Sequence, residues 1–177
     1  MLRRNLFFAP RSVKMKAYQS CVLPILEYAP SSWQPTSESL NSALEMVQHN
    51  AARFIANAYS KKGHFKIISI SKILNELKME TLEERRNQAR LTMAYKILNG
   101  QVILEPNTLP KFINKKPPRG CNINNVGIEN QLIEPQSRLL SIGKTFFFSI
   151  PKIWNQRVTP HQAKSPSVDS FKKHFKK

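Results

Sequence analysis

Carboxylates are the residues on which metal-dependent chemistry at phosphate depends, and this sequence has few that could converge on a metal. Asp169 is the sole aspartate of the 177 residues. Two-metal phosphoryl transfer needs several carboxylates around cations roughly 3.5 to 4 Å apart. Glu83 and Glu84 are adjacent, so on a helix they diverge by about 100°, and Glu76 and Glu80 have the spacing of a solvated helix face. The sequence therefore predicts no catalytic carboxylate cluster.

Metal ligands and nucleophiles are equally scattered. Cys21 lies on the apolar stripe of an expected helix, where a thiol packs as an inert side chain, and Cys121 is a hundred residues away, which favours a reducing compartment. Phosphate-cradling loops need clustered glycines, whereas the five here stand singly. No HxxxH or CxxC spacing joins the histidines, which are His49, His64, His161 and His174. We expect no metal, no cofactor, no small-molecule substrate and no catalysis by this chain on its own.

Basic residues give the stronger signal, and it is one of binding. Lys and Arg number 28 against 11 carboxylates, for a formal charge of +17 and a pI of 10.2. A phosphate backbone is the commonest partner of such a chain, with an anionic membrane surface or plain solubility as alternatives. Helical spacing places four cations within about 140° of one surface: Arg85, Arg86, Arg90 and Lys96. Lys61, Lys62 and Lys66 would extend this predicted nucleic-acid patch, whose alternative is a solubilising face.

The elements that would position these residues are helices. Apolar residues three and four apart predict helices over 12–29, bent at Pro24, and over 37–59, with a shorter one around 70–77. Thr81 and Glu84 form a capping box that starts a further helix. Its later half, up to Asn99 and Gly100, is apolar on two faces, so we expect it between the helices of 12–29 and 37–59, with its arginines exposed on the first turns.

Beyond Gly100 the periodicity stops. We therefore predict a mainly α fold: a small bundle of about four helices over 1–100, an irregular Pro- and Asn-rich linker over 101–136, and an apolar segment over 137–177 that packs on the bundle and ends in a short helix capped by Ser167. Phe146, Phe147 and Phe148 with Trp154 could stack on bases, or form core. Residues 106–177 carry 13 lysines and arginines against three carboxylates.

Membrane and export signals are weak. The apolar start of the chain stops at Pro10, too early for a signal peptide, and no stretch approaches the roughly 20 apolar residues of a membrane span. The sequence predicts an intracellular protein of nucleus or cytoplasm with no membrane partner, and leaves its oligomeric state open.

An ordered set of segments carries a family resemblance. The set is "LRRNL" at 2–6, "AYQSCVLPILEYAPSSWQP" at 17–35, "LEMVQHNAARFI" at 44–55, "ILNELKMETLEERRNQARLTMAYKILNG" at 73–100, "FFFSIPKIWN" at 146–155 and "SPSVDSFKKHFKK" at 165–177. In this order they resemble the region after the palm in reverse transcriptases of jockey- and CR1-like non-LTR retrotransposons, namely the thumb and the C-terminal segment. The resemblance covers nearly the whole chain.

The resemblance implies a thumb, a small helical bundle that grips the template and primer duplex leaving the active site. Glu27, Tyr28 and Trp33 match its "EY...W.P" motif, Arg85 and Arg86 match "LeeRR", and Trp154 falls in the last apolar motif. The metal-binding Tyr-x-Asp-Asp motif belongs to the palm, which we expect to be missing because Met1 begins inside the family pattern. Mg²⁺ and catalysis would therefore belong to the parent polymerase through that palm.

Three hypotheses follow. The chain is a polymerase fragment that holds RNA, DNA or their hybrid without catalysis; or it is a working polymerase fragment; or it is a non-functional relic or basic helical interaction protein with no polymerase role.

Overall fold

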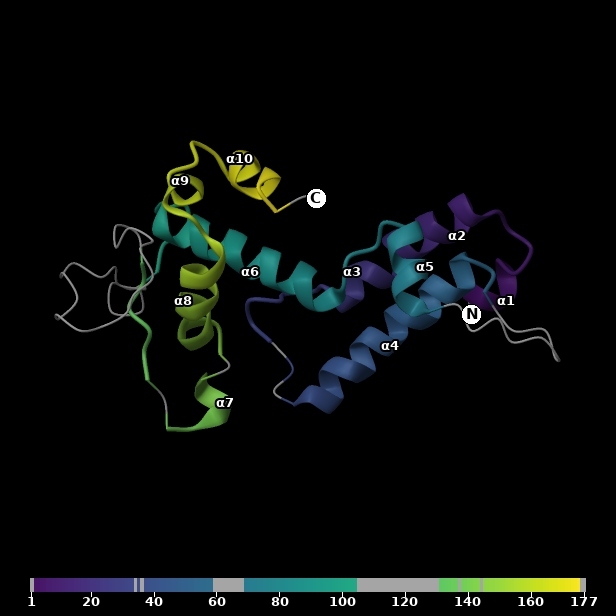
Figure 1. Cartoon of the computed structure of the whole chain (residues 1–177), viewed down its shortest axis with the longest axis horizontal. Helices are drawn as coiled ribbons and strands as arrows, with labels where there is room; N and C mark the ends of the chain where they lie inside the picture. The colour runs from purple at the N-terminus through teal and green to yellow at the C-terminus, as the bar shows by residue number, and fades with distance from the viewer. Residues whose placement is uncertain are drawn as a thin grey trace. The chain divides into compact units, whose positions relative to one another are not determined.

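The computed structural model describes residues 2–33, 35, 37–58, 69–104, 131–136, 138–143 and 145–175. Over these residues the fold is mainly helical and has no strand, which confirms the predicted fold class (Figure 1). The chain divides into two compact units. Unit 1 comprises Met1–Ala29 and Pro35–Arg86, and unit 2 comprises Pro30–Gln34 and Asn87–Lys177.

The division falls within a helix rather than at residue 100, where the sequence placed it. Helix α6 (Leu82–Leu98) gives its first residues to unit 1 and the rest to unit 2. Unit 1 also contains α1 (Leu2–Asn5), α2 (Arg11–Ala17), the π-helical turn η1 (Tyr18–Val22), α3 (Leu23–Leu26), α4 (Glu38–Ile55) and α5 (Ile70–Glu76). Unit 2 adds α7 (Leu140–Gly143), α8 (Phe146–Arg157), α9 (Pro160–Ala163) and α10 (Val168–Lys173).

The bend predicted at Pro24 takes the form of a π-helical turn. Leu23 donates its backbone N–H to the carbonyl of Tyr18, five residues back. Pro24 has no N–H and cannot donate the next bond of the ladder. Single π turns inside α-helices relieve such interruptions, so the predicted helix over 12–29 is three consecutive helical pieces.

Three helices end in the same left-handed cap. Asn57, Lys78 and Gly100 have φ of 55°, 52° and 68°. In each case the following N–H bonds a carbonyl five residues back, as Ala58 N does with Arg53 O at 2.9 Å. This is the Schellman arrangement, which satisfies carbonyls left over at a helix end. Gly100, noted in the sequence as the end of its segment, adopts this conformation without strain.

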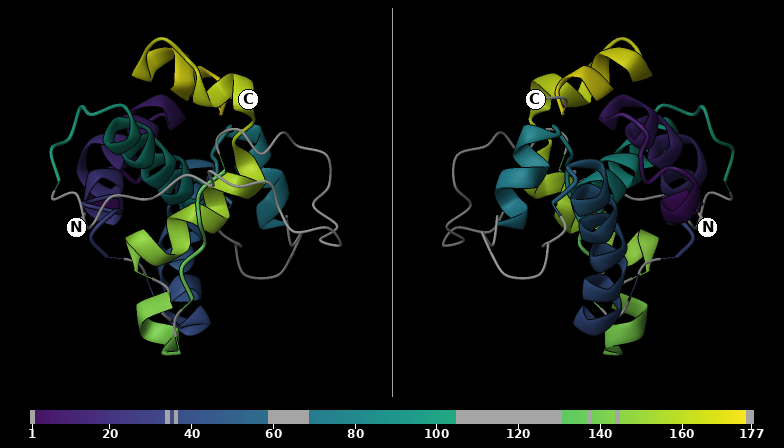
Figure 2. Two further views of the ribbon diagram at one scale, coloured as in Figure 1. Left: turned by 90° about the vertical axis from the view of Figure 1, so that its left-hand side faces the viewer. Right: turned by 90° about the vertical axis from the view of Figure 1, so that its right-hand side faces the viewer.

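Unit 1 is held together where α5 packs beside the C-terminal part of α4 (Figures 1 and 2). Ala52 of α4 and Ile73 and Leu74 of α5 are buried together. The predicted apolar stripe is more exposed toward the start of α4, because Leu40 in the first turn and Val47 midway along the helix are 54% and 42% exposed. Only the second half of that stripe is therefore core.

Unit 2 buries the apolar half of α6 against the C-terminal segment. Tyr95 stacks on Phe171 with ring centroids 4.5 Å apart, and Trp154 stacks on Phe171 at 5.9 Å. Figure 1 shows α8 crossing α6, followed by α9 and α10. The predicted position of this half between the helices of 12–29 and 37–59 is wrong, because α8 and α10 supply the aromatic surface that its two apolar faces need.

The end of the predicted linker belongs to this core. Leu132 is fully buried. The side-chain amide of Asn155 in α8 accepts from Leu132 N and donates to Leu132 O, both at 2.9 Å. One side-chain amide thus satisfies both the N–H and the carbonyl of this buried residue.

Within the described part of the chain, no helix has the length and apolar character needed to cross a membrane.

Candidate nucleic-acid interface

Arg85 is bound inside unit 1 by a carboxylate. Its Nε donates to Oε1 of Glu27, and its Nη2 donates to Oε2 of Glu27 at 3.1 Å. This two-point geometry is the strongest that arginine makes with a carboxylate. The hydrogen bond with Glu27 raises the pKa of Arg85 above its ordinary value. The predicted motif residues Glu27 and Arg85 are therefore joined, and their charges offset each other.

Arg86 is buried, with 2% of its surface exposed. Its Nη2 donates to Oδ1 of Asn41 at 3.1 Å, a contact between α6 and α4 within unit 1. The sequence prediction of an exposed Arg86 is wrong, since this face of the first α6 turns packs on α4.

Arg90 is also buried, at 1% exposure, in unit 2. Its Nη2 donates to Ser149 Oγ, and its guanidinium carbon lies 5.7 Å from the centroid of the Phe146 ring. Burial lowers the pKa of Arg90 to about 10, so the group is still charged at neutral pH. The predicted exposure of Arg90 is wrong for a physical reason: the aromatic face and the serine hydroxyl of α8 hold the cation in the core.

The predicted patch therefore does not form one surface. Lys96, on the last turn of α6, is half-buried. Lys61, Lys62 and Lys66 lie outside the described residues, and their predicted part in binding stays a prediction.

The aromatic residues predicted to stack on bases or form core are also partly buried and partly exposed. Phe146 and Trp154 are buried at 8% and 2% exposure, which supports the core reading over base stacking, whereas Phe147 is 38% exposed. Of the other motif residues, Tyr28 is 74% and Trp33 38% exposed.

Exposed cations occur on unit 2 in positions that the predicted patch did not include. In α8, α9 and α10 and the turns between them, the exposed cations are Lys152, Arg157, Lys164, Lys172 and Lys173. Asp169 and Glu134 are the carboxylates of the described part of this unit. The signal for this surface was the set of 13 basic residues against three carboxylates over 106–177, which periodicity could not assign to a helix face. We call these five residues the unit 2 cationic set.

Catalytic groups do not gather. Across the described ranges, no three His, Cys, Asp or Glu residues lie close enough to hold a metal ion. The rings of His161 and His174 meet edge to face, 6.1 Å apart. Cys21 is exposed rather than packed in the core as predicted, because the π-helical turn around it rotates the later residues of the stripe.

Comparison with known proteins gave no match to a protein-family model, to a curated protein or to a solved structure.

Proposed function

We propose that this chain holds nucleic acid through phosphate contacts and has no polymerase activity of its own. The observation that carries the proposal is the charge: +17 overall, with exposed cations along α8 to α10 opposed by few carboxylates. Lysine and arginine at a surface displace the counterions of a phosphate backbone, which favours binding without reading sequence.

The family resemblance makes the proposal more specific. A thumb and C-terminal region of a non-LTR retrotransposon RNA-directed DNA polymerase would grip an RNA–DNA duplex, while chemistry would require the palm and its Mg²⁺. The helical fold is compatible with such a module. Because Arg85, Arg86 and Arg90 are held by groups within the fold, we assign the grip to the unit 2 cationic set.

The test is fluorescence anisotropy with a short RNA–DNA hybrid between 50 and 200 mM salt. Each phosphate contact contributes about 0.9 to the slope of log affinity against log salt, so about three contacts should lower affinity more than tenfold over this range. The triple variant Lys152→Glu, Arg157→Glu and Lys172→Glu should flatten that slope. The matched control reverses three exposed lysines of unit 1, Lys16, Lys72 and Lys78, with the same change in net charge. An equal loss of affinity and salt dependence in both variants would show that net charge alone, and not the unit 2 cationic set, accounts for binding.

The alternative is a basic helical protein without a nucleic-acid role, and the burial of Arg86 and Arg90 favours it in one respect. Those two arginines are buried inside the fold, so their presence does not demand a polyanion. Affinity that is insensitive to salt would support this alternative. Nucleotide incorporation by the purified chain would instead support the working polymerase fragment.

A further inference from the structure

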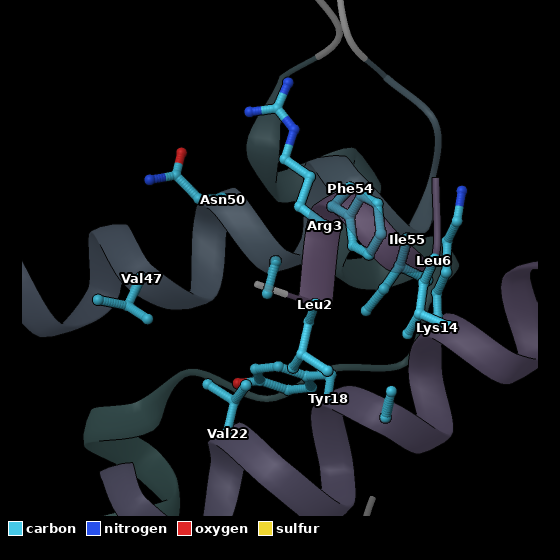
Figure 3. Close-up of a pocket in the computed structure, with 12 residues that line it drawn as sticks. Leu2, Arg3, Leu6, Lys14, Tyr18, Val22, Val47, Asn50, Phe54 and Ile55 are labelled. Carbon is cyan, nitrogen blue, oxygen red and sulfur yellow. The ribbon is translucent and has the colours of Figure 1, made fainter. Parts of the chain in front are cut away.

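Unit 1 contains an apolar pocket of about 360 Å³ that the proposed function does not use (Figure 3). Its walls come from α1, α2, η1 and the second half of α4. Small-molecule sites are typically apolar clefts of about 300 to 1,000 Å³ with a few polar groups that fix orientation. The pocket has this size and character, and all of its lining residues belong to one compact unit.

Two of the four polar side chains that line the pocket are cations, Arg3 and Lys14, and the other two belong to Tyr18 and Asn50. Lys14 is 2% exposed, and its Nζ donates to Asn57 Oδ1 at 2.5 Å and lies 4.7 Å from the centroid of the Phe54 ring. An ammonium has three N–H donors, and within the described residues no carboxylate pairs with this one. Lys14 lies near the C-terminus of α4, whose free carbonyls supply only a partial negative charge. Arg11 Nη2 donates to one of these carbonyls, Ala56 O, at 3.2 Å.

The pocket has two chemically different sides. In Figure 3 the Phe54 ring lies between the side chains of Arg3 and Lys14, whereas Val22 and Val47 lie away from Lys14. The Tyr18 hydroxyl donates its proton to Gln48 Oε1 at 3.3 Å, so that proton is not offered to a ligand. A ligand anion would therefore be attracted to Lys14, on one side of the Phe54 ring, and an apolar chain would lie toward Val22 and Val47.

We propose that this pocket binds an amphiphilic carboxylate, an unbranched apolar chain with one anionic end. The carboxylate would supply the full negative charge that the buried Lys14 lacks among its described neighbours, and a buried charge is stabilised strongly when it is paired. The chain would cover the apolar walls, which contribute about 25 cal/mol per Å² removed from water.

The test uses sodium decanoate below its micelle concentration, with decanol as the uncharged control. Backbone amide shifts of Ala51 and Phe54 in NMR spectra of the full chain report binding at the pocket. We expect saturable one-to-one binding, with decanoate at least tenfold tighter than decanol. Lys14→Met should remove that preference and Lys14→Arg should keep it.

Val47→Trp fills the pocket from a residue that is 42% exposed, so folding should tolerate it even if Lys14→Met does not fold. It should abolish binding of both probes. Decanoate binding no tighter than that of decanol, or binding that survives Val47→Trp, would overturn the proposal. Shifts of the same amides with protein concentration alone would also overturn it, by showing that a second copy covers the pocket.

Discussion

The two units use arginine in different ways. In unit 1, Arg85 meets Glu27 and Arg11 meets Glu76, the latter at 2.7 Å, so these two arginines are paired with carboxylates, whereas Arg86 meets the amide of Asn41. In unit 2, the buried Arg90 meets a serine hydroxyl and an aromatic ring of α8. The exposed cations of unit 2 meanwhile outnumber its described carboxylates. A basic residue in the sequence therefore indicates a polyanion site only if its side chain is exposed in the folded chain.

The largest expected effect tests whether unit 2 depends on its aromatic core. Phe171 is fully buried and contacts the rings of Tyr95 and Trp154, so Phe171→Ala should lower the free energy of unfolding by about 3 to 5 kcal/mol. Hydrogen exchange followed by mass spectrometry should show protection lost in α8 and α10 and kept in α4. The control Phe147→Ala, at a ring 38% exposed, should have a much smaller effect. Equal loss of protection in α4 would show that the two units unfold together.

A smaller effect distinguishes unit 1 by its pH dependence. Burial, with a contribution from Glu27, raises the pKa of Tyr18 to about 12 from 10.0. The folded state thus keeps the phenol neutral where the unfolded state ionises, so this contribution is full below pH 10 and is lost as pH rises toward 12. This pKa difference of two units between the folded and unfolded states corresponds to about 2 to 3 kcal/mol in the free energy of unfolding. Urea unfolding at pH 9 and 11.5 should show this loss, and Tyr18→Phe should reduce it. An unchanged loss in the variant would assign the pH effect to other groups.

The smallest effect concerns the buried cation of unit 2. Arg90→Met keeps an unbranched apolar side chain and removes the charge, whose desolvation lowers the pKa of Arg90 to about 10. Replacing a buried ion by an apolar residue of similar size is often neutral or stabilising. Ser149 keeps a partner, since its hydroxyl donates to Thr145 O at 2.6 Å. We expect a melting temperature equal to or above that of the native chain and nucleic-acid affinity within twofold. A tenfold fall in nucleic-acid affinity would show instead that Arg90 contributes to binding.

Local signals in the sequence predicted the caps and ends of several helices, although α8 was expected only as part of an apolar segment. Ser167 caps α10 by accepting from Ser170 N at 3.1 Å, and Thr81 Oγ1 accepts from Glu84 N at 3.2 Å. Gly100 ends α6 as expected. These features depend on residues a few positions apart, where sequence spacing fixes geometry.

Tertiary partners were not predictable in the same way. The two apolar faces of α6 required neighbours, but periodicity does not say which helices supply them, and α8 and α10 lie far along the chain. The predicted patch failed for the same reason, since Asn41 and Ser149 are distant in sequence from the arginines they bind. The unit 2 cationic set was visible only as composition.

Lysine footprinting tests the central claim most directly, because one sample of the intact chain reports on both units at once. The chain is acetylated with a water-soluble reagent, with and without a short RNA–DNA hybrid, and modified lysines are quantified by mass spectrometry. We predict that the hybrid protects Lys152, Lys164, Lys172 and Lys173, all exposed in unit 2, and leaves Lys16, Lys72 and Lys78 of unit 1 reactive. Protection of the unit 1 lysines instead, or of none, would contradict the account.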